Sequence, residues 1–230
     1  CSEEGWNDHV YPNNAGTMMD RNLGATSATP GDVGAFGLLY QWGRKDPFMG
    51  TCAISGTTLA ASTGSWTTIQ NSQTVDYAEE NPMTYIGSGS SEWCTGMGAS
   101  DDDYTKRWME SKKTMYDPCP VGYRVPDGGE NGFWATANVK YTGDDTNRGI
   151  YWTLADGETT AWYPAVGYRS HDSGSLFSVG EGGYCWSAFP NPSSTHLAYN
   201  LSLNSNGIVY PADLSFRGDG NSVRCVRESY

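Results

Sequence analysis

The sequence has little of what several functional classes need. No run of about 18 apolar residues occurs in its 230 residues, so no transmembrane segment is expected. Only 14 Lys and Arg stand against 26 Asp and Glu, which gives a formal net charge of −12. Because affinity for nucleic acids is carried mainly by Lys and Arg, we expect no nucleic-acid partner.

The common catalytic motifs are also missing. The three histidines, His9, His171 and His196, are too scattered for an H-E-x-x-H zinc site. No G-x-S-x-G elbow, P-loop, dinucleotide fingerprint or C-x-x-C pair occurs. The serines of "GSGSS" at 87–91 lie in a glycine-rich stretch that is typical of a flexible loop. We therefore predict no catalytic residue.

Acidic segments are the only candidates for a metal site. "DDDY" at 101–104, "PDGGEN" at 126–131 and "GDD" at 143–145 each offer oxygen ligands, which calcium prefers. None has the spacing of an EF-hand loop, and acidic loops on an acidic protein are usually only solvated. We predict no cofactor and no metal, with calcium as the alternative.

Glycine and aromatic residues are abundant instead. The chain holds 29 Gly, 9 Trp and 15 Tyr but only 17% charged residues, a composition typical of loop-rich extracellular proteins. Its six cysteines fit an oxidising compartment, and six cysteines allow 15 pairings. Cys52 and Cys94 are candidates for a bridge that staples a Ser-, Thr- and Gly-rich insertion at about 50–104. The start, Cys1 before Ser and two Glu, fits a mature lipoprotein or a fragment boundary equally well.

Hydrophobic periodicity predicts two helices and several strands. An apolar stripe of Ala35, Leu38, Leu39 and Trp42, with Asp32 as N-cap, predicts a helix over 32–43. A second short helix is expected at 132–137. Neither an internal repeat nor a linker is evident, so we predict one domain over 1–230. Strands are expected at 17–22, 121–125, 161–169, 184–188, 198–204 and 221–227.

The strand at 198–204 has the clearest pattern. Tyr199, Leu201 and Leu203 alternate with polar residues, which predicts that these three side chains face the core. "NSNG" at 204–207 then predicts a tight turn.

Six ordered motifs carry a family resemblance. They are "AGTMMDRNLGA" at 15–25, "GLLYQWGRKDPF" at 37–48, "YDPCPVGYRVP" at 116–126, "WYPAVGYR" at 162–169, "GYCWSA" at 183–188 and "NSVRCVRE" at 221–228. In this order, over nearly the whole chain, they resemble the Fibrobacter succinogenes major paralogous domain, which is common in surface proteins of gut Bacteroidetes.

The resemblance implies a fold and a disulfide. Such members look like α+β, C-type lectin-like folds with the architecture of formylglycine-generating enzymes: loop-rich, with short antiparallel strands, two helices and a ligand surface near the C-terminal strands. It also implies a bridge between Cys119 and Cys225, which would stabilise the fold by about 2–4 kcal/mol. The calcium-and-sugar motif of animal C-type lectins and the paired catalytic cysteines of the oxidases have no counterpart here, so the fold does not carry activity across.

Some proteins of this fold are diversified by retroelements that mutate adenines in a C-terminal variable region. A randomised AAC or AAT codon cannot become Glu, Gln, Lys, Met or Trp. These five residues number 34 of 230 in the chain, yet none occurs in the 41 residues from Ser187 to Arg227. About six would be expected at the chain-average frequency, so we predict a variable region at 187–221.

The predicted binding surface follows from this window. Trp186, Tyr199, Leu201, Leu203, Val223 and Val226 are expected to form buried scaffold. Intervening side chains are expected to face a ligand: Ala188, Phe189, Asn191, Thr195, His196, Asn200, Ser202, Asn204, Ile208, Tyr210, Asp213, Leu214, Ser215, Phe216, Gly218 and Asp219. Exposed aromatic residues among them would serve as anchors, unless they pack under a neighbouring loop.

We therefore expect a non-enzymatic binding domain whose partner is a protein or glycan on another cell. Its location would be extracellular or the cell surface, as a lipoprotein or pilus tip, or a phage tail fibre. One alternative is a structural surface module without diversification. Another is a relative of the formylglycine-generating oxidases, for which Cys185 is the candidate reactive thiol.

Overall fold

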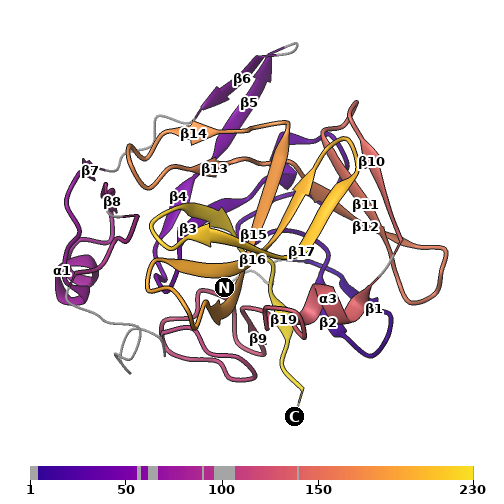
Figure 1. Ribbon diagram of the computed structural model, residues 1–230. Coiled ribbons are helices and arrows are strands. Elements are labelled where there is room, and N and C mark those ends of the chain that lie inside the picture. The colour runs from indigo at the N-terminus through magenta and orange to yellow at the C-terminus, as the bar shows by residue number, and fades with distance from the viewer. Residues whose placement is uncertain are drawn as a thin grey trace.

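The computed structural model describes residues 5–55, 58–61, 67–89, 91–95, 107–138 and 140–229, with backbone alone at 51–55 and 58–61. It is mostly β-sheet with short helices and long loops, an α+β arrangement (Figure 1). None of the helices in these residues is long and apolar enough to cross a membrane.

The elements of the N-terminal half are short. Its helices within the described residues are a 3-10 turn, η1 (Val33–Ala35), and α1 (Val75–Glu80). The strands are β1 (Asp8–Tyr11), β2 (Gly16–Met19), β3 (Leu38–Gln41), β4 (Pro47–Met49), β5 (Thr51–Ser55), β6 (Thr58–Ala61), β7 (Thr67–Ile69) and β8 (Thr84–Ile86).

The C-terminal half contains the longer strands and one helix, α3 (Phe133–Ala137). The strands are β9 (Tyr123–Arg124), β10 (Tyr141–Asp144), β11 (Gly149–Thr153), β12 (Thr160–Pro164), β13 (Tyr168–Arg169), β14 (Leu176–Phe177), β15 (Gly182–Pro190), β16 (Leu197–Asn204), β17 (Ile208–Phe216), β18 (Gly220–Ser222) and β19 (Val226–Arg227).

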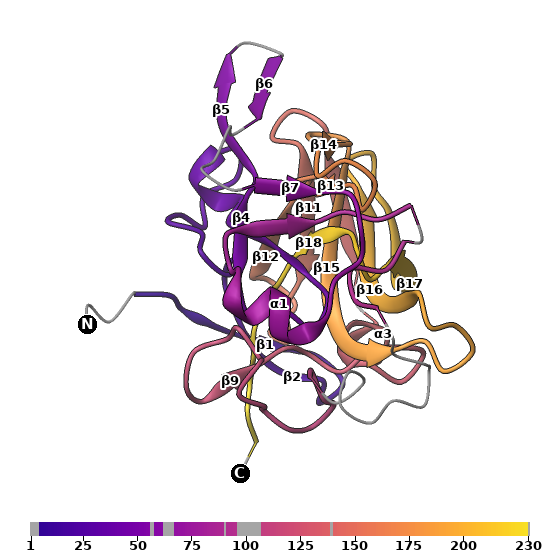
Figure 2. The same ribbon diagram turned by 90° about the vertical axis from the view of Figure 1, so that its left-hand side faces the viewer.

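The largest sheet has the order β14-β13-β18-β15-β16-β17, and β3 and β4 branch from β18. A second sheet, β1-β2-β19-β9, pairs the two ends of the described chain, and β10-β11-β12 form a third. Figure 2 shows the β5–β6 hairpin projecting away from these sheets. The long β15–β16–β17 meander forms the front of the view in Figure 1.

Aromatic residues fill two large cores. One gathers Trp42, Trp93, Trp108 and Trp186, and the other gathers Trp134, Trp152 and Tyr163 with Leu201 and Leu203. The indole N–H groups of the first core donate to backbone carbonyls: Trp42 to Ser187, Trp186 to Tyr40 and Trp93 to Trp42. These bonds let large amphipathic rings be buried without unpaired donors, which ties distant loops to the sheet.

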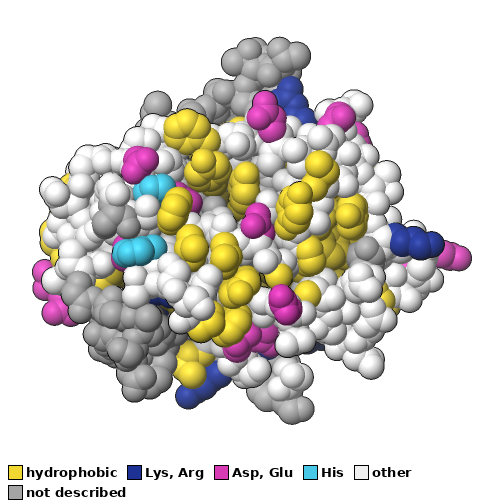
Figure 3. Space-filling view, viewed as in Figure 1, with side chains coloured by type: hydrophobic (Ala, Val, Ile, Leu, Met, Phe, Trp, Pro, Cys, Tyr) yellow, Lys and Arg dark blue, Asp and Glu magenta, His cyan; other side chains and the backbone are white. Residues whose placement is uncertain are grey.

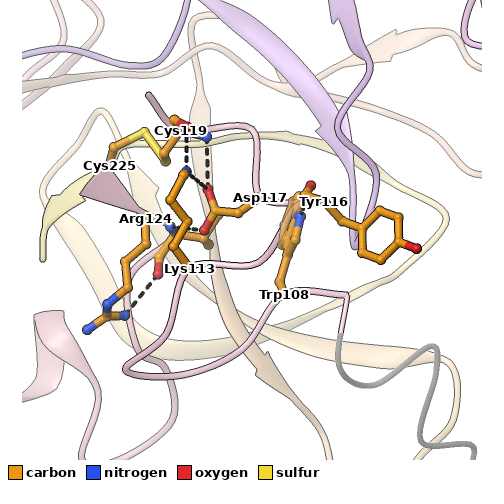
Figure 4. The surroundings of a disulfide bond; sticks show 8 residues. Trp108, Lys113, Tyr116, Asp117, Cys119, Arg124 and Cys225 are labelled. Atoms are coloured by element: carbon orange, nitrogen blue, oxygen red, sulfur yellow. Dashed lines mark hydrogen bonds and ion pairs between the residues drawn. A yellow bond between two sulfur atoms is a disulfide. The ribbon is translucent and has the colours of Figure 1, made fainter. Parts of the chain in front are cut away.

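A disulfide joins Cys119 to Cys225, as the family resemblance implied. Figure 4 shows the buried Asp117 carboxylate beside it, and that carboxylate accepts bonds from the backbone N–H of Cys119 and of Val125, both at 2.8 Å. The ammonium of Lys113 lies 3.2 Å from the same carboxylate. Burial raises the pKa of Asp117 by more than these bonds and the Lys113 charge lower it, so the net shift is upward. The bridge and the carboxylate together fix the loop before β9 to the C-terminal strands.

The helix predicted over 32–43 is wrong. Asp32 does cap a turn, accepting from Gly34 N–H at 2.9 Å, but the turn ends after Ala35. Gly37 has φ of 74°, and a Cβ there would lie 2.7 Å from the Leu23 carbonyl oxygen, so the chain leaves the helical region. The following residues pair with β18 as β3. The predicted stripe is nevertheless largely buried, because a strand can also turn those side chains inward.

The other local predictions fared better. The helix at 132–137 is confirmed as α3, and the predicted strands all overlap observed ones, although 161–169 and 221–227 each divide into two. Within the described part of 50–104, short strands occur as expected, together with the unpredicted helix α1. The strand β17 was not predicted at all.

Candidate functional site

The β16–β17 hairpin forms the centre of the predicted surface. Its turn is the predicted one: Gly207 N–H donates to the Asn204 carbonyl at 2.9 Å, and Gly207 has φ of 94°. At the far end Arg217 is buried, with Nε donating to the Leu197 carbonyl at 3.0 Å and its guanidinium over the Trp42 ring. The hairpin is therefore fixed at both ends.

A β-bulge divides β17 into two halves. Ser202 pairs with Tyr210 and Asn200 pairs with Asp213, so Pro211 and Ala212 together oppose the single residue Leu201. Proline has no backbone N–H and is tolerated at such an irregularity. The extra residue interrupts the alternation of β17 at 211–213, although the exposed side chains before it, Ile208 and Tyr210, and after it, Leu214 and Phe216, stay at even positions.

The structure spreads the predicted site residues over a range of exposure. Five are exposed: His196, Ile208, Tyr210, Leu214 and Phe216. Seven are half-buried: Phe189, Asn191, Thr195, Ser202, Asn204, Asp213 and Ser215. Four are buried: Ala188, Asn200, Gly218 and Asp219.

For the four buried positions, the prediction of an outward-facing side chain is wrong. Ala188 packs into the tryptophan core with Trp186. Asn200 is 1% exposed, and its amide lies 2.9 Å from Ser215 Oγ. Gly218 donates to the Ser91 carbonyl at 3.1 Å. These groups belong to the scaffold, because each of them is buried.

Asp219 is buried by its partner His171. Its Oδ1 accepts from the backbone N–H of His171 and lies 2.8 Å from that residue's Nδ1.

Tyr199 was predicted to be buried and Phe189 to face a ligand, but the structure leaves both half-buried. The Tyr199 ring stacks on Phe189 with centroids 5.3 Å apart. Phe189 in turn covers the turn at Gly128–Gly129, so this aromatic does pack under a neighbouring loop.

Two adjoining hollows of about 300 Å³ each lie on the exposed face. The first, here called the Tyr184–Tyr210 hollow, is lined by Glu181, Tyr184, Ser202, Asn204, Ile208 and Tyr210 among others. The second, the Tyr184–Phe216 hollow, is lined by Tyr168, Tyr184, Leu197, Leu214, Phe216 and Asp219 among others. Figure 3 shows hydrophobic side chains gathered over this region, with Lys and Arg at the periphery of the view.

The sequence analysis missed the part of this surface that precedes residue 187. Tyr168 contacts Tyr184 edge-on at 5.3 Å and stacks with Phe177 at 5.9 Å. His171 contacts Phe216 edge-on at 4.7 Å. These residues come from β13, β14, β15 and the loop after β13, and no local pattern marks them. Only the strand order brings them beside β17.

Carboxylates surround the aromatic rings. Burial raises the pKa of Tyr184, and the charges of Asp213 and Asp219 raise it further. The pKa of Tyr168 is raised by burial and then by the charges of Asp219, Tyr184 and Asp172. Both phenols are therefore neutral donors at physiological pH, in a negative field.

Ser91, His171 and Asp219 form a hydrogen-bonded chain that resembles a hydrolase triad in outline. Ser91 Oγ lies 3.2 Å from His171 Nε2. The same Nε2 also lies 3.2 Å from a carboxylate oxygen of Asp172, so a carboxylate faces each ring nitrogen. The hydrogen bond to Asp219 raises the pKa of His171. The two carboxylates favour the protonated form of the ring, and a protonated imidazole is a poor general base.

Cys185 lacks the exposure and the low pKa of a reactive thiol. Cys185 is 4% exposed, and burial raises the pKa of its thiol to about 11. A nucleophilic cysteine needs an accessible thiolate. Cys94 is also buried, while the side chain of Cys52 lies outside the described residues, so their pairing stays a prediction.

Among the residues that the structure describes, no group of three or more His, Cys, Asp or Glu side chains is arranged so that it could hold a metal ion. Asp127 forms an ion pair with Arg124 at 2.6 Å, and Asp144 caps a turn by accepting from Thr146 and Asn147 N–H. The segment 101–104 lies outside the described residues.

Two larger hollows lie elsewhere. One of about 640 Å³ is lined by Trp6, Arg21, Pro118 and Pro120 among others, and one of about 550 Å³ by Arg124, Asp127, Phe133 and Arg227 among others. Each adjoins an end of the described chain and neither contains an exposed aromatic cluster. The predicted face thus has smaller hollows than these two, but it carries the exposed Tyr210 and Phe216.

Comparisons with known proteins identify no relative: no family model, no curated protein and no solved structure matches the chain.

Proposed function

We propose that the chain is a non-enzymatic ligand-binding domain, with a diversified surface on a C-type lectin-like scaffold of the Fibrobacter succinogenes major paralogous type. Its partner is a protein or glycan on another cell surface. It acts outside the cell, on the cell surface or on a phage tail fibre. The Cys119–Cys225 bridge fits such an oxidising environment.

One observation carries the proposal. One hairpin holds four large exposed apolar side chains: Ile208, Tyr210, Leu214 and Phe216. All four lie within 187–227, the segment that contains no Glu, Gln, Lys, Met or Trp. Large apolar side chains gathered on a surface typically mark a binding site, and aromatic ones are favoured anchors. These four side chains are not part of the buried cores. We therefore expect that other residues can replace them without loss of the fold.

The two rival functions gain less support. An oxidase would need an accessible thiolate, whereas Cys185 is buried and its pKa is raised. A structural surface module would have no reason to hold four large apolar side chains in solvent. Neither rival accounts for the exposed hairpin.

The test is the DNA sequence that flanks the gene. We expect a near-copy of codons 187–227 beside a reverse transcriptase gene, differing from the coding copy only where the template carries adenine. The differences should fall at exposed positions such as Tyr210 and Phe216. If the locus contains neither a repeat nor a reverse transcriptase, diversification is refuted and an ordinary surface module becomes the better interpretation.

A further inference from the structure

The Tyr184–Tyr210 hollow has a distinct chemistry. Tyr184, Ser202 and Tyr210 are cross-strand neighbours on β15, β16 and β17, so their side chains share one face. Adjacent strands lie about 4.8 Å apart, which separates the two tyrosines by roughly 10 Å. The small Ser202 between them does not fill that space, and two phenol rings therefore flank an open gap.

The Tyr184 ring is held in place rather than free. It leans over Gly182, where an added Cβ would lie 3.1 Å from the phenol oxygen, and it contacts Tyr168 edge-on. Ser178, Ser202 and Asn204 add side-chain oxygens around the ring. The hollow thus offers aromatic faces and hydrogen-bond acceptors on fixed strands.

The charge around this hollow is negative and unbalanced. From Ser170 to Phe216 the sequence contains no Lys or Arg, but it does contain Asp172, Glu181 and Asp213. Asp172 and Asp219 each lie within ion-pair distance of His171. Among the residues that the structure describes, the carboxylates of Glu181 and Asp213 have no ion-pair partner; Asp213 accepts only the backbone N–H of Leu214.

We infer that this hollow binds the guanidinium of an arginine side chain on the partner, an inference that rests on the proposed binding function. A flat guanidinium stacks on aromatic rings and donates several hydrogen bonds, so it fits a gap between phenols that is rimmed by a carboxylate. The exposed Ile208 and the Tyr184–Phe216 hollow would contact apolar groups of the partner beside that arginine. Charge complementarity with a net charge of −12 also speeds the encounter with a basic partner.

Phage-displayed random peptides, panned on the full chain and on its Tyr210→Ala variant, provide the test. We expect the wild-type chain to enrich arginine-containing peptides that the variant does not hold. Replacing that arginine by citrulline, which has the same shape without the charge, should weaken binding about tenfold. Glu181→Gln should weaken it about twofold to fivefold, and rising salt should do the same. Glu158→Gln removes an equal charge from an exposed site elsewhere and should leave binding unchanged.

The outcomes separate the two proposals. Peptides that need Tyr210 but contain no arginine, or that tolerate citrulline, would overturn the arginine inference and leave the binding face intact. Peptides that bind wild type and Tyr210→Ala equally, or no enrichment at all, would count against the binding face itself and against the inference built on it.

Discussion

His171 Nδ1 lies 2.8 Å from Asp219 Oδ1, and the same carboxylate oxygen accepts the backbone N–H of His171. This pair joins the loop after β13 to the loop after β17. Because the His171 ring also contacts Phe216, the pair holds one end of the aromatic face in position. A buried carboxylate that the sequence assigned to ligand contact is thus part of the support beneath it.

The pair predicts a pH-dependent stability. The folded-state pKa of His171 is raised by its bond to Asp219, so its stabilising contribution is complete below the ordinary histidine pKa and is lost as pH rises through the raised value. We expect the wild-type chain to lose unfolding free energy, relative to Asp219→Asn, as the pH increases across that window. Urea unfolding of both proteins at matched pH values measures this difference. A constant difference between the two would show that the pair is not ionised.

Buried and half-buried positions of one strand should respond differently to substitution. Asn200→Ala removes a buried amide that bonds the Ser215 hydroxyl, so we expect a loss of about 1–3 kcal/mol in unfolding free energy. Ser202→Ala, two residues along on the open face, should change it by less than about 0.5 kcal/mol. Chemical denaturation compares the two. Equal effects would mean that Asn200 is a surface position, as the sequence pattern suggested.

The disulfide should contribute substantially to stability. Cys119 and Cys225 are 106 residues apart, so their bridge restricts the unfolded chain over nearly half its length. The double substitution Cys119→Ala and Cys225→Ala should lower the unfolding free energy by about 2–4 kcal/mol. Reduction of the wild-type protein under the same conditions is the control. Identical midpoints for oxidised and reduced wild type would contradict the prediction.

The Cys185 thiol should be inert in the folded protein. It is buried in the second core, and its pKa is raised to about 11, so almost no thiolate is present at neutral pH. We expect iodoacetamide to leave Cys185 unmodified in native protein and to alkylate it fully in urea, as read by peptide mass spectrometry. Rapid alkylation of the native protein would restore the oxidase interpretation.

The exposed hairpin should tolerate change. Tyr210 is 58% exposed and lies beyond both cores, so Tyr210→Ser should alter the unfolding midpoint little while removing a binding anchor. Phe189→Ser is the contrasting substitution, because Phe189 stacks on Tyr199 and covers a glycine turn. It should destabilise the protein measurably in a thermal melt. If Tyr210→Ser is the more damaging of the two, the hairpin is scaffold and not display surface.

Local pattern determined much of this protein in advance. Alternation identified β16, the "NSNG" turn follows from residues that tolerate positive φ, and composition pointed to a loop-rich chain. These signals need only neighbours in sequence. A glycine such as Gly37 can interrupt a helical stripe, and the stripe then fits either a helix or a strand. Pairing with β18 selects the strand here.

The tertiary structure alone decided which residues form the surface. The bulge at Pro211 and Ala212 interrupts the alternation of β17 and so hides this strand from a search for a period of two. Tyr168 and Tyr184 enter the face only because β13, β18 and β15 are adjacent in the sheet. Asp219 leaves it because its partner His171 lies on a distant segment of the chain. Burial depends on contacts between residues that are distant in sequence. The absence of five residue types from 187–227 could therefore locate the hairpin, but it could not show which of its side chains are buried and which are exposed.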